Sequence, residues 1–178
     1  MTSCPDIPVA RPLFDLMDRL AIAHRTLQHV AVYTVAESRE LRGTIPGAHS
    51  KNLFLKDKKG RLFLVTALED APLNLKKLHE AIGGQGRVSF GSAEQLRACL
   101  GVEPGSVTPF AAMNDTDGRV TVVLQRKLAE APVLNFHPLT NTATTTITNQ
   151  DLLQFLAAIG HPPHIVDLPE GEASSPEA

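Results

Sequence analysis

Apolar residues recur at helical spacing in several parts of the chain. In residues 12–20, leucine, phenylalanine and methionine return every three or four positions, and Pro12 is tolerated in the first helical turn. Residues 92–95 form a capping box, Ser-Ala-Glu-Gln, that begins a helix extending to Leu100, and Gly101 follows as a stop signal. Comparable patterns predict helices over residues 36–41 and 73–82, and one that begins near Asn149 with Thr148 as its cap and ends at Gly160.

Other segments alternate apolar and polar residues or are rich in β-branched side chains. Residues 51–56 and 61–66 predict two strands joined by the turn Asp-Lys-Lys-Gly, a hairpin with glycine where the turn needs it. In the first of these strands Lys51 lies on the same face as two leucines, which is unusual for a strand at the surface. Further strands are predicted over residues 30–35, 119–125, 142–148 and 165–168.

The order of these elements indicates the fold class. Strands outnumber helices and follow no regular strand–helix–strand repeat, which argues against a doubly wound parallel sheet. We therefore expect an α/β protein of the α+β type, with a mixed, largely antiparallel sheet and helices packed around it. The chain of 178 residues is long enough for one domain with a sizeable core. We expect this domain to occupy residues 1–168, with the helix at 12–20 as a candidate lid, and residues 169–178 to form a disordered acidic tail.

The distribution of charge qualifies the small net charge of −2. Residues 37–61 carry seven basic and three acidic side chains, so the rest of the chain is clearly negative. A local basic patch could contact a phosphate backbone, whereas the outer lysines of the hairpin could equally belong to a solvated tip. Aromatic residues are few, with no tryptophan and a single tyrosine, which argues against a single-stranded nucleic-acid platform made of stacked rings.

The residues also exclude several kinds of chemistry. Cys4 and Cys99 have no metal or dithiol spacing, and Cys99 fits a helical apolar face as a small buried residue. No His-Glu-x-x-His, Gly-x-Ser-x-Gly, Walker or Rossmann motif occurs, so we expect no metal, no nucleotide cofactor and no nucleophilic triad. The chain has no signal peptide and no long apolar run, which favours a cytoplasmic location without membrane contact.

Two segments are candidate ligand sites. Residues 135–145 combine one histidine, two asparagines and four threonines with no carboxylate or lysine, which fits neither a solvated surface nor an apolar core. Uncharged donors and acceptors of this kind fit the wall of a cavity that holds a polar, carbonyl-containing ligand. The loop at residues 105–109, Gly-Ser-Val-Thr-Pro, can bring backbone N–H groups close to a ligand as an oxyanion hole requires, although taken alone it is better explained as a structural turn.

Three motifs, taken in order along the chain, resemble one known family. They are residues 47–55 (Gly-Ala-His-Ser-Lys-Asn-Leu-Phe-Leu), residues 105–109, and residues 135–144 (Asn-Phe-His-Pro-Leu-Thr-Asn-Thr-Ala-Thr). Together they resemble the YbaK-like aminoacyl-tRNA editing family, which is related to the insertion domain of bacterial prolyl-tRNA synthetase. The resemblance extends over about residues 13–168 and is strongest to free-standing members that deacylate Ala-tRNA(Pro).

The resemblance implies hydrolysis, in trans, of the ester that joins a mischarged alanine to the terminal adenosine of tRNA(Pro). It implies that Lys51 meets a phosphate or the ester region, that residues 105–109 hold the aminoacyl group through their backbone, and that His137 shapes a pocket for a small amino acid. The candidate catalytic residues are Lys51 and His137, and the candidate substrate-binding residues are Asn52, Gly105, Ser106, Val107, Thr108, Pro109 and Asn141. Singly, Lys51 could be a solvent-facing strand lysine and His137 a core histidine.

Such a site needs little acid–base power, because the ester is activated and positioning with oxyanion stabilisation can suffice. In related editing domains a ribose hydroxyl of the substrate is thought to help activate water, which fits a chain with no strong general base. His137 could act as a base or as a gate on substrate size. A pocket that fits a methyl group can exclude the pyrrolidine ring of proline by clash.

Two alternatives stay open at this level. The enzyme could prefer Cys-tRNA(Pro) or another small amino acid, or the protein could be a catalytically silent module that binds tRNA or a synthetase. The expected partner is the acceptor end of tRNA(Pro), with prolyl-tRNA synthetase or an elongation factor as further candidates. No cofactor is expected.

Overall fold

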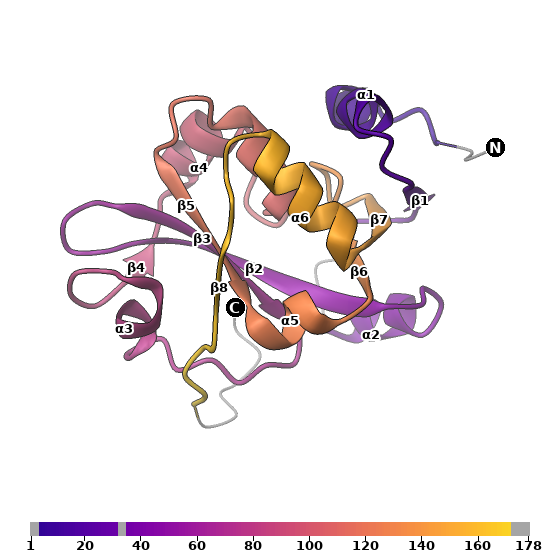
Figure 1. Ribbon diagram of the computed structural model, residues 1–178. Coiled ribbons are helices and arrows are strands. Elements are labelled where there is room, and N and C mark those ends of the chain that lie inside the picture. Colours follow the sequence, from indigo (N-terminus) through magenta and orange to yellow (C-terminus); the bar gives the residue numbers. More distant parts are fainter. Residues whose placement is uncertain (1–3, 32–34, 172–178) are drawn as a thin grey trace.

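The computed structural model describes residues 4–31 and 35–171 of the chain, which form a sheet with helices on both sides (Figure 1). Two 3-10 helices, η1 (Pro8–Ala10) and η2 (Pro109–Asn114), accompany the α-helices α1 (Arg11–Arg19), α2 (Val35–Arg42), α3 (Leu78–Ile82), α4 (Ala93–Leu100), α5 (Arg126–Glu130) and α6 (Asn149–Ala158). The strands are β1 (Arg25–Gln28), β2 (Ala48–Lys56), β3 (Leu62–Leu68), β4 (Ser89–Phe90), β5 (Val120–Gln125), β6 (Val133–Phe136), β7 (Ala143–Thr148) and β8 (His164–Val166).

The strands pair in a mixed sheet that is mostly antiparallel. Their order is β1-β7-β6-β2-β3-β5-β8, and β4 pairs with β2 outside this path. The pairings β1–β7, β6–β7, β2–β3 and β2–β4 are antiparallel, whereas β2–β6, β3–β5 and β5–β8 are parallel. The predicted fold class is therefore confirmed.

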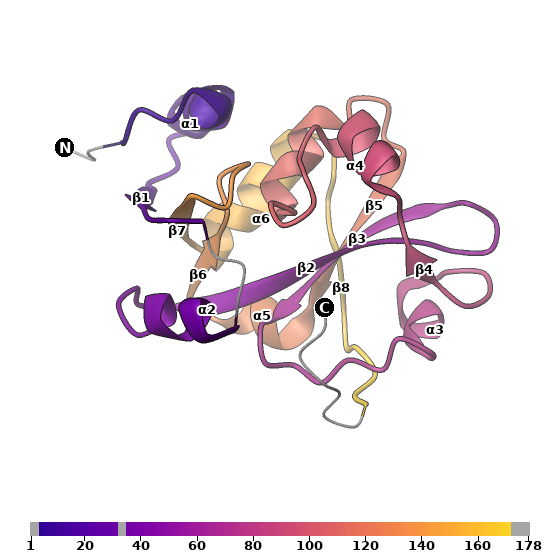
Figure 2. The same ribbon diagram turned by 180° about the vertical axis from the view of Figure 1, so that it is seen from behind.

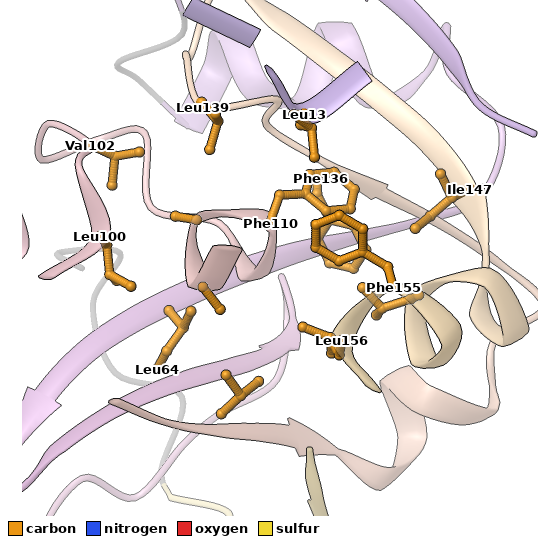
Figure 3. Packing of buried hydrophobic residues seen from close by; sticks show 14 of the residues in the cluster. Leu13, Leu64, Leu100, Val102, Phe110, Phe136, Leu139, Ile147, Phe155 and Leu156 are labelled. Atoms are coloured by element: carbon orange, nitrogen blue, oxygen red, sulfur yellow. The ribbon is translucent and has the colours of Figure 1, made fainter. Parts of the chain in front are cut away.

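The hairpin of β2 and β3 lies at the centre of the sheet, and both of its faces are covered. Phe54 joins a hydrophobic cluster that includes residues of α4, η2 and α6, whereas the leucines on either side of it join a second cluster that includes residues of α3. Figures 1 and 2 show α4 and α6 on one side of these strands and α3 on the other. In the larger cluster the ring of Phe110 meets those of Phe136 and Phe155 edge to face, with centroids 5.4 and 5.5 Å apart (Figure 3).

Elements with strong local signals form where the sequence predicts them. The hairpin, α1, α2, β5 and β7 coincide with predicted elements to within a few residues. Helix α4 begins with the predicted capping box, in which Ser92 Oγ accepts from the Gln95 N–H at 3.1 Å and Gln95 Oε1 accepts from the Ser92 N–H at 3.0 Å. Thr148 caps α6 by accepting from the Asp151 N–H at 3.1 Å.

The helix predicted over residues 73–82 is wrong in its first half, because α3 begins only at Leu78. Leu73 instead forms an isolated antiparallel bridge with Glu170. Hydrogen bonds to this distant segment satisfy backbone groups that a helix would satisfy locally. The same bridge shows that the beginning of the predicted tail pairs with the body of the domain; residues 172–178 lie outside the described residues.

The strand predicted over residues 30–35 is also wrong, because the observed strand, β1, lies earlier in the chain and Val35 already belongs to α2. Residues 32–34 lie outside the described residues. Strand β1 pairs with β7, where the hydroxyls of Thr26 and Thr145 are hydrogen-bonded at 2.7 Å. Strand β8 begins one residue before its predicted range and ends two residues earlier. Three short elements, β4, α5 and β6, were not predicted from the sequence.

Candidate functional site

Strand β2 has an interrupted edge. Its first two residues, Ala48 and His49, pair with β6, and its last two, Leu55 and Lys56, pair with β4. Between these partners, residues 50–53 pair with β3 on one side and, within the described part of the chain, with no strand on the other. At about 3.3 Å per residue, about 13 Å of strand edge is left open.

A cavity of about 370 Å³ lies at this open edge. Its size is within the range of small-molecule sites, and its lining is apolar with a few polar groups, as such sites require. Five of the nine residues singled out by sequence line it, namely Lys51, Asn52, Gly105, Val107 and His137. The other lining residues are Ser50, Leu53, Phe54, Phe90, Gly91, Ala93, Leu96 and Pro104.

Lys51 is partly buried, and its ammonium group is bound to the loop after β3. Nζ donates a hydrogen bond to the carbonyl oxygen of Ala71. Burial lowers the pKa of Lys51 from its usual value, and the carboxylates of Asp70 and Glu69 act in the opposite direction. A cation held in this way can attract a phosphate group or stabilise a developing negative charge.

Asn52 lies on the face of β2 opposite to Lys51, as alternation along a strand requires. Its Oδ1 accepts a hydrogen bond from the hydroxyl of Thr66 on β3 at 2.7 Å, which fixes the orientation of the side-chain amide. Next to it, Ser50 Oγ donates to the Asn135 carbonyl oxygen at 3.1 Å and so joins β2 to β6 where the open edge begins. The polar end of the cavity is thus held by two side-chain hydrogen bonds to neighbouring strands.

The loop at residues 105–109 is divided between the cavity and the core. Gly105 has φ +92°, a conformation that favours glycine, and it lines the cavity together with Val107. A side chain at Gly105 would place its Cβ 3.8 Å from Asn141 Nδ2, so Asn141 lies beside the loop although it does not line the cavity. The remaining loop residues, Ser106, Thr108 and Pro109, are buried outside the cavity lining, and Thr108 caps η2.

His137 follows β6 and presents a neutral ring to the cavity. Because a carbonyl oxygen can only accept, the 3.1 Å contact between His137 Nδ1 and the Ala143 oxygen means that Nδ1 carries the proton. Burial lowers the pKa of His137 below its ordinary value, and the hydrogen bond to Ala143 offsets part of that effect. At pH 7 the ring is therefore neutral, with Nε2 as a hydrogen-bond acceptor.

The rest of the polar segment at residues 135–145 serves the fold. Asn135 is 3% exposed; its Nδ2 donates to the Pro46 carbonyl oxygen at 3.0 Å, and its Oδ1 accepts from the Thr146 hydroxyl at 2.6 Å. Of the whole segment only His137 lines the cavity. The prediction of a polar cavity wall is therefore wrong for most of this segment, because Asn135, Thr144 and Thr145 bond to other parts of the chain and the hydroxyls of Thr140 and Thr142 bond to each other.

The described residues contain no group of three or more His, Cys, Asp or Glu side chains that could hold a metal ion. Cys99 is buried in α4, as predicted, and Cys4 is exposed. No helix within residues 4–31 and 35–171 is long and apolar enough to cross a membrane.

A model of the aminoacyl-tRNA editing domain matches residues 29–155, more than half of the chain. The chain belongs to the aminoacyl-tRNA editing domain family. It is 38% identical over 162 residues to a prolyl-tRNA synthetase associated domain-containing protein 1 from Danio rerio, covering 90% of this chain and 88% of that protein. It is 32% identical over 157 residues to the prolyl-tRNA editing protein ProX of Acetoanaerobium sticklandii, covering 88% and 95%. A crystal structure of a candidate trans-editing enzyme for prolyl-tRNA synthetase has the same fold, with a TM-score of 0.71 at 22% identity over 94% of this chain and 100% of that one.

The residues around β4 belong to the cavity but were not predicted from the sequence. Phe90 and Gly91 both line the cavity, and a side chain at Gly91 would place its Cβ 2.5 Å from the ring of Phe54. Only glycine therefore allows the Phe54 ring to pack against this strand. The available signal was an aromatic residue and a glycine directly before the capping serine of α4, but it becomes meaningful only once β4 is known to pair with β2.

Proposed function

We propose that the protein is a trans-acting deacylase that removes alanine from mischarged tRNA(Pro). The observation that carries this proposal is that one cavity brings together Lys51, Gly105 and His137, which come from three separate motifs. The printed names of the relatives, which refer to prolyl-tRNA synthetase and prolyl-tRNA editing, support tRNA(Pro) as the substrate and the synthetase as a partner.

The reaction is the hydrolysis of the aminoacyl ester on the terminal adenosine. The water oxygen bonds to the carbonyl carbon, the bond from that carbon to the ribose oxygen breaks, and the ribose oxygen takes up a proton. Negative charge collects on the carbonyl oxygen in the tetrahedral intermediate. In this proposal the backbone N–H groups of Gly105 and Val107 stabilise that oxygen, and the Lys51 ammonium binds the phosphate or ester region of the adenosine.

His137 is proposed to orient the substrate. Its neutral ring offers Nε2 as an acceptor for a ribose hydroxyl or for the α-ammonium group of the amino acid. Since the ester is activated, orientation and oxyanion stabilisation account for catalysis without a strong base in the cavity. In this proposal the apolar side chains of Val107 and Leu96 receive the methyl group of alanine, and a tight fit there rejects the larger pyrrolidine ring by clash.

Deacylation of four purified substrates tests this proposal: Ala-, Cys-, Ser- and Pro-tRNA(Pro). We expect Ala-tRNA(Pro) to be hydrolysed fastest and Pro-tRNA(Pro) to be spared. Lys51→Ala is expected to abolish turnover, whereas Lys127→Ala is the matched control because it removes an exposed lysine on α5 that is paired with Glu170 at 3.0 Å.

Each outcome has a distinct meaning. No hydrolysis of any substrate, with tRNA binding retained, would show a silent binding module. Preferential hydrolysis of Cys-tRNA(Pro) would refute the alanine assignment and leave the deacylase activity standing. Near-normal turnover by Lys51→Ala would show that Lys51 takes no part in the reaction.

A further inference from the structure

Phe90 differs from the other phenylalanines of the chain. The six others are at most 6% exposed, whereas Phe90 is 52% exposed. Single exposed apolar side chains are common, so exposure alone assigns no role to this ring. Its position assigns a role, because the exposed ring also lines the cavity and therefore lies at the mouth of the cavity.

The backbone of β4 holds this ring in place. Phe90 pairs with Leu55 of β2, and the next residue, Gly91, donates its N–H to the Phe54 carbonyl oxygen at 2.9 Å. Because Gly91 has no side chain, the Phe54 ring packs directly against β4. Phe90 is thus fixed at its backbone while its ring remains open to solvent, as a preformed contact for a flat ligand requires.

The ring shares a face of the sheet with Lys51. Cross-strand neighbours lie on the same face, so Phe90 is on the face of Leu55, and alternation along β2 puts Lys51 on that face as well. Lys51 is four residues from Leu55, or about 13 Å along the strand. An aromatic surface and a cation on the same face of the sheet match the flat base and the phosphate of a nucleotide.

We propose that Phe90 is the platform on which the terminal adenine of the tRNA stacks while the aminoacyl group occupies the cavity. This inference rests on the proposed function and adds a positioning contact for the base. Every nucleobase has a flat π face, and one ring serves one terminal base. The scarcity of aromatic residues argues against an extended single-stranded platform and is consistent with a single stacked base.

The test uses an acceptor-stem hairpin of tRNA(Pro) that carries no amino acid and has 2-aminopurine in place of its terminal adenine. Stacking quenches 2-aminopurine fluorescence, so we expect the wild-type protein to quench it on binding. Phe90→Tyr keeps the ring and is expected to keep the quenching. Phe90→Leu keeps the apolar bulk, loses the quenching and raises Kd by about 10-fold, the size expected for one lost base–aromatic stack. Val9→Ala is the control, since Val9 is also 52% exposed but does not line the cavity.

Deacylation kinetics separate this inference from the proposed function. We expect Phe90→Leu to raise KM for Ala-tRNA(Pro) by about 10-fold and to change kcat little, because the base lies away from the reacting carbonyl. Quenching and Kd like those of the wild type in Phe90→Leu would overturn the platform, as would an equal loss in Val9→Ala. If quenching depends on the ring but no aminoacyl-tRNA is hydrolysed, the proposed function fails and the platform stands.

Discussion

Asn135→Asp is the sharpest test of how the cavity is supported. The substitution replaces the NH2 group of the side-chain amide (Nδ2) with an oxygen of similar size. That amide donates to the carbonyl oxygens of Pro46 and Ala48 at 3.0 and 3.3 Å, and the side chain is 3% exposed. An ionised carboxylate there would face two acceptors with no donor between them, so the variant carboxyl is expected to stay protonated in the folded state.

The cost follows from the pKa of an aspartate in the unfolded chain. Holding a proton at pH 7, about three units above the ordinary pKa of about 3.9, costs about 4 kcal/mol. The protonated carboxyl can donate to only one of the two carbonyls, and the lost hydrogen bond costs about 1 kcal/mol more. A total of about 5 kcal/mol is comparable to the whole stability of a marginal domain of about 5–15 kcal/mol.

The stability deficit of Asn135→Asp depends on pH. The pKa of Asp in the folded variant is raised above its unfolded value, so the stability deficit grows as pH rises above about 4 and shrinks as pH falls toward it. Urea unfolding at pH 7 and pH 5 should therefore show the difference between wild type and Asn135→Asp narrowing by about 2.7 kcal/mol at the lower pH. Asn114→Asp is the matched control, because Asn114 is exposed and bonds one carbonyl, that of Leu100, at 2.9 Å.

We expect the control to lie within about 1.5 kcal/mol of wild type at both pH values, as loss of one hydrogen bond implies. If Asn135→Asp unfolds within about 1 kcal/mol of wild type at pH 7, the buried donor network is not what holds β6 to the segment before β2. A deficit that is the same at both pH values would equally refute the reasoning, because it would mean that no proton is retained on folding.

Three further predictions follow from individual contacts. Because the pKa of His137 is lowered, kcat measured from pH 8 down to pH 5 should stay level to about pH 6.5 and decline only below it. A kcat that instead rises as the pH falls would show that His137 acts in its charged form. Four hydrogen bonds outweigh the burial of Asp57 and lower its pKa to about 2, so Asp57→Asn should lower the free energy of unfolding in urea by about 2 kcal/mol. The stabilisation by Asp57 in the wild type should persist above about pH 4 and vanish as the pH falls toward 2. An unchanged unfolding midpoint of Asp57→Asn would contradict this. Gly91→Ala should lower the free energy of unfolding by about 1–3 kcal/mol, because the new Cβ would lie 2.5 Å from the Phe54 ring. Gly43→Ala is the control, since a Cβ there would have no contact closer than 3.5 Å. Equal effects of the two substitutions would refute the packing argument.

Sequence predicted those parts of the fold whose signals are local. The capping box of α4 and the turn of the β2–β3 hairpin depend on residues three or four positions apart, so they could be read without knowledge of the rest of the molecule. The helix prediction failed for residues 73–77 because their backbone forms hydrogen bonds near Glu170. A helical pattern of side chains does not reveal that a distant segment will supply those hydrogen bonds.

The candidate site was predicted in outline and for a partly mistaken reason. The polar segment from Asn135 onward is unusual in its composition, yet Asn135 and Thr145 bond to neighbouring strands, and only His137 lines the cavity. The residues around β4 were missed because their role depends on a register that only the folded sheet defines. A polar side chain in a sequence can be satisfied by a ligand or by its own protein, and composition does not distinguish the two.

The interrupted edge of β2 has a mechanical consequence. Strands β6 and β4 hold the two ends of this edge, and the stretch at residues 50–53 between them is braced by β3 alone among the described strands. A ligand seated there would span from the β6 end to the β4 end and would supply the missing brace. The bound molecule would thus complete the sheet, and backbone amides of this stretch should exchange with solvent more slowly when the site is filled.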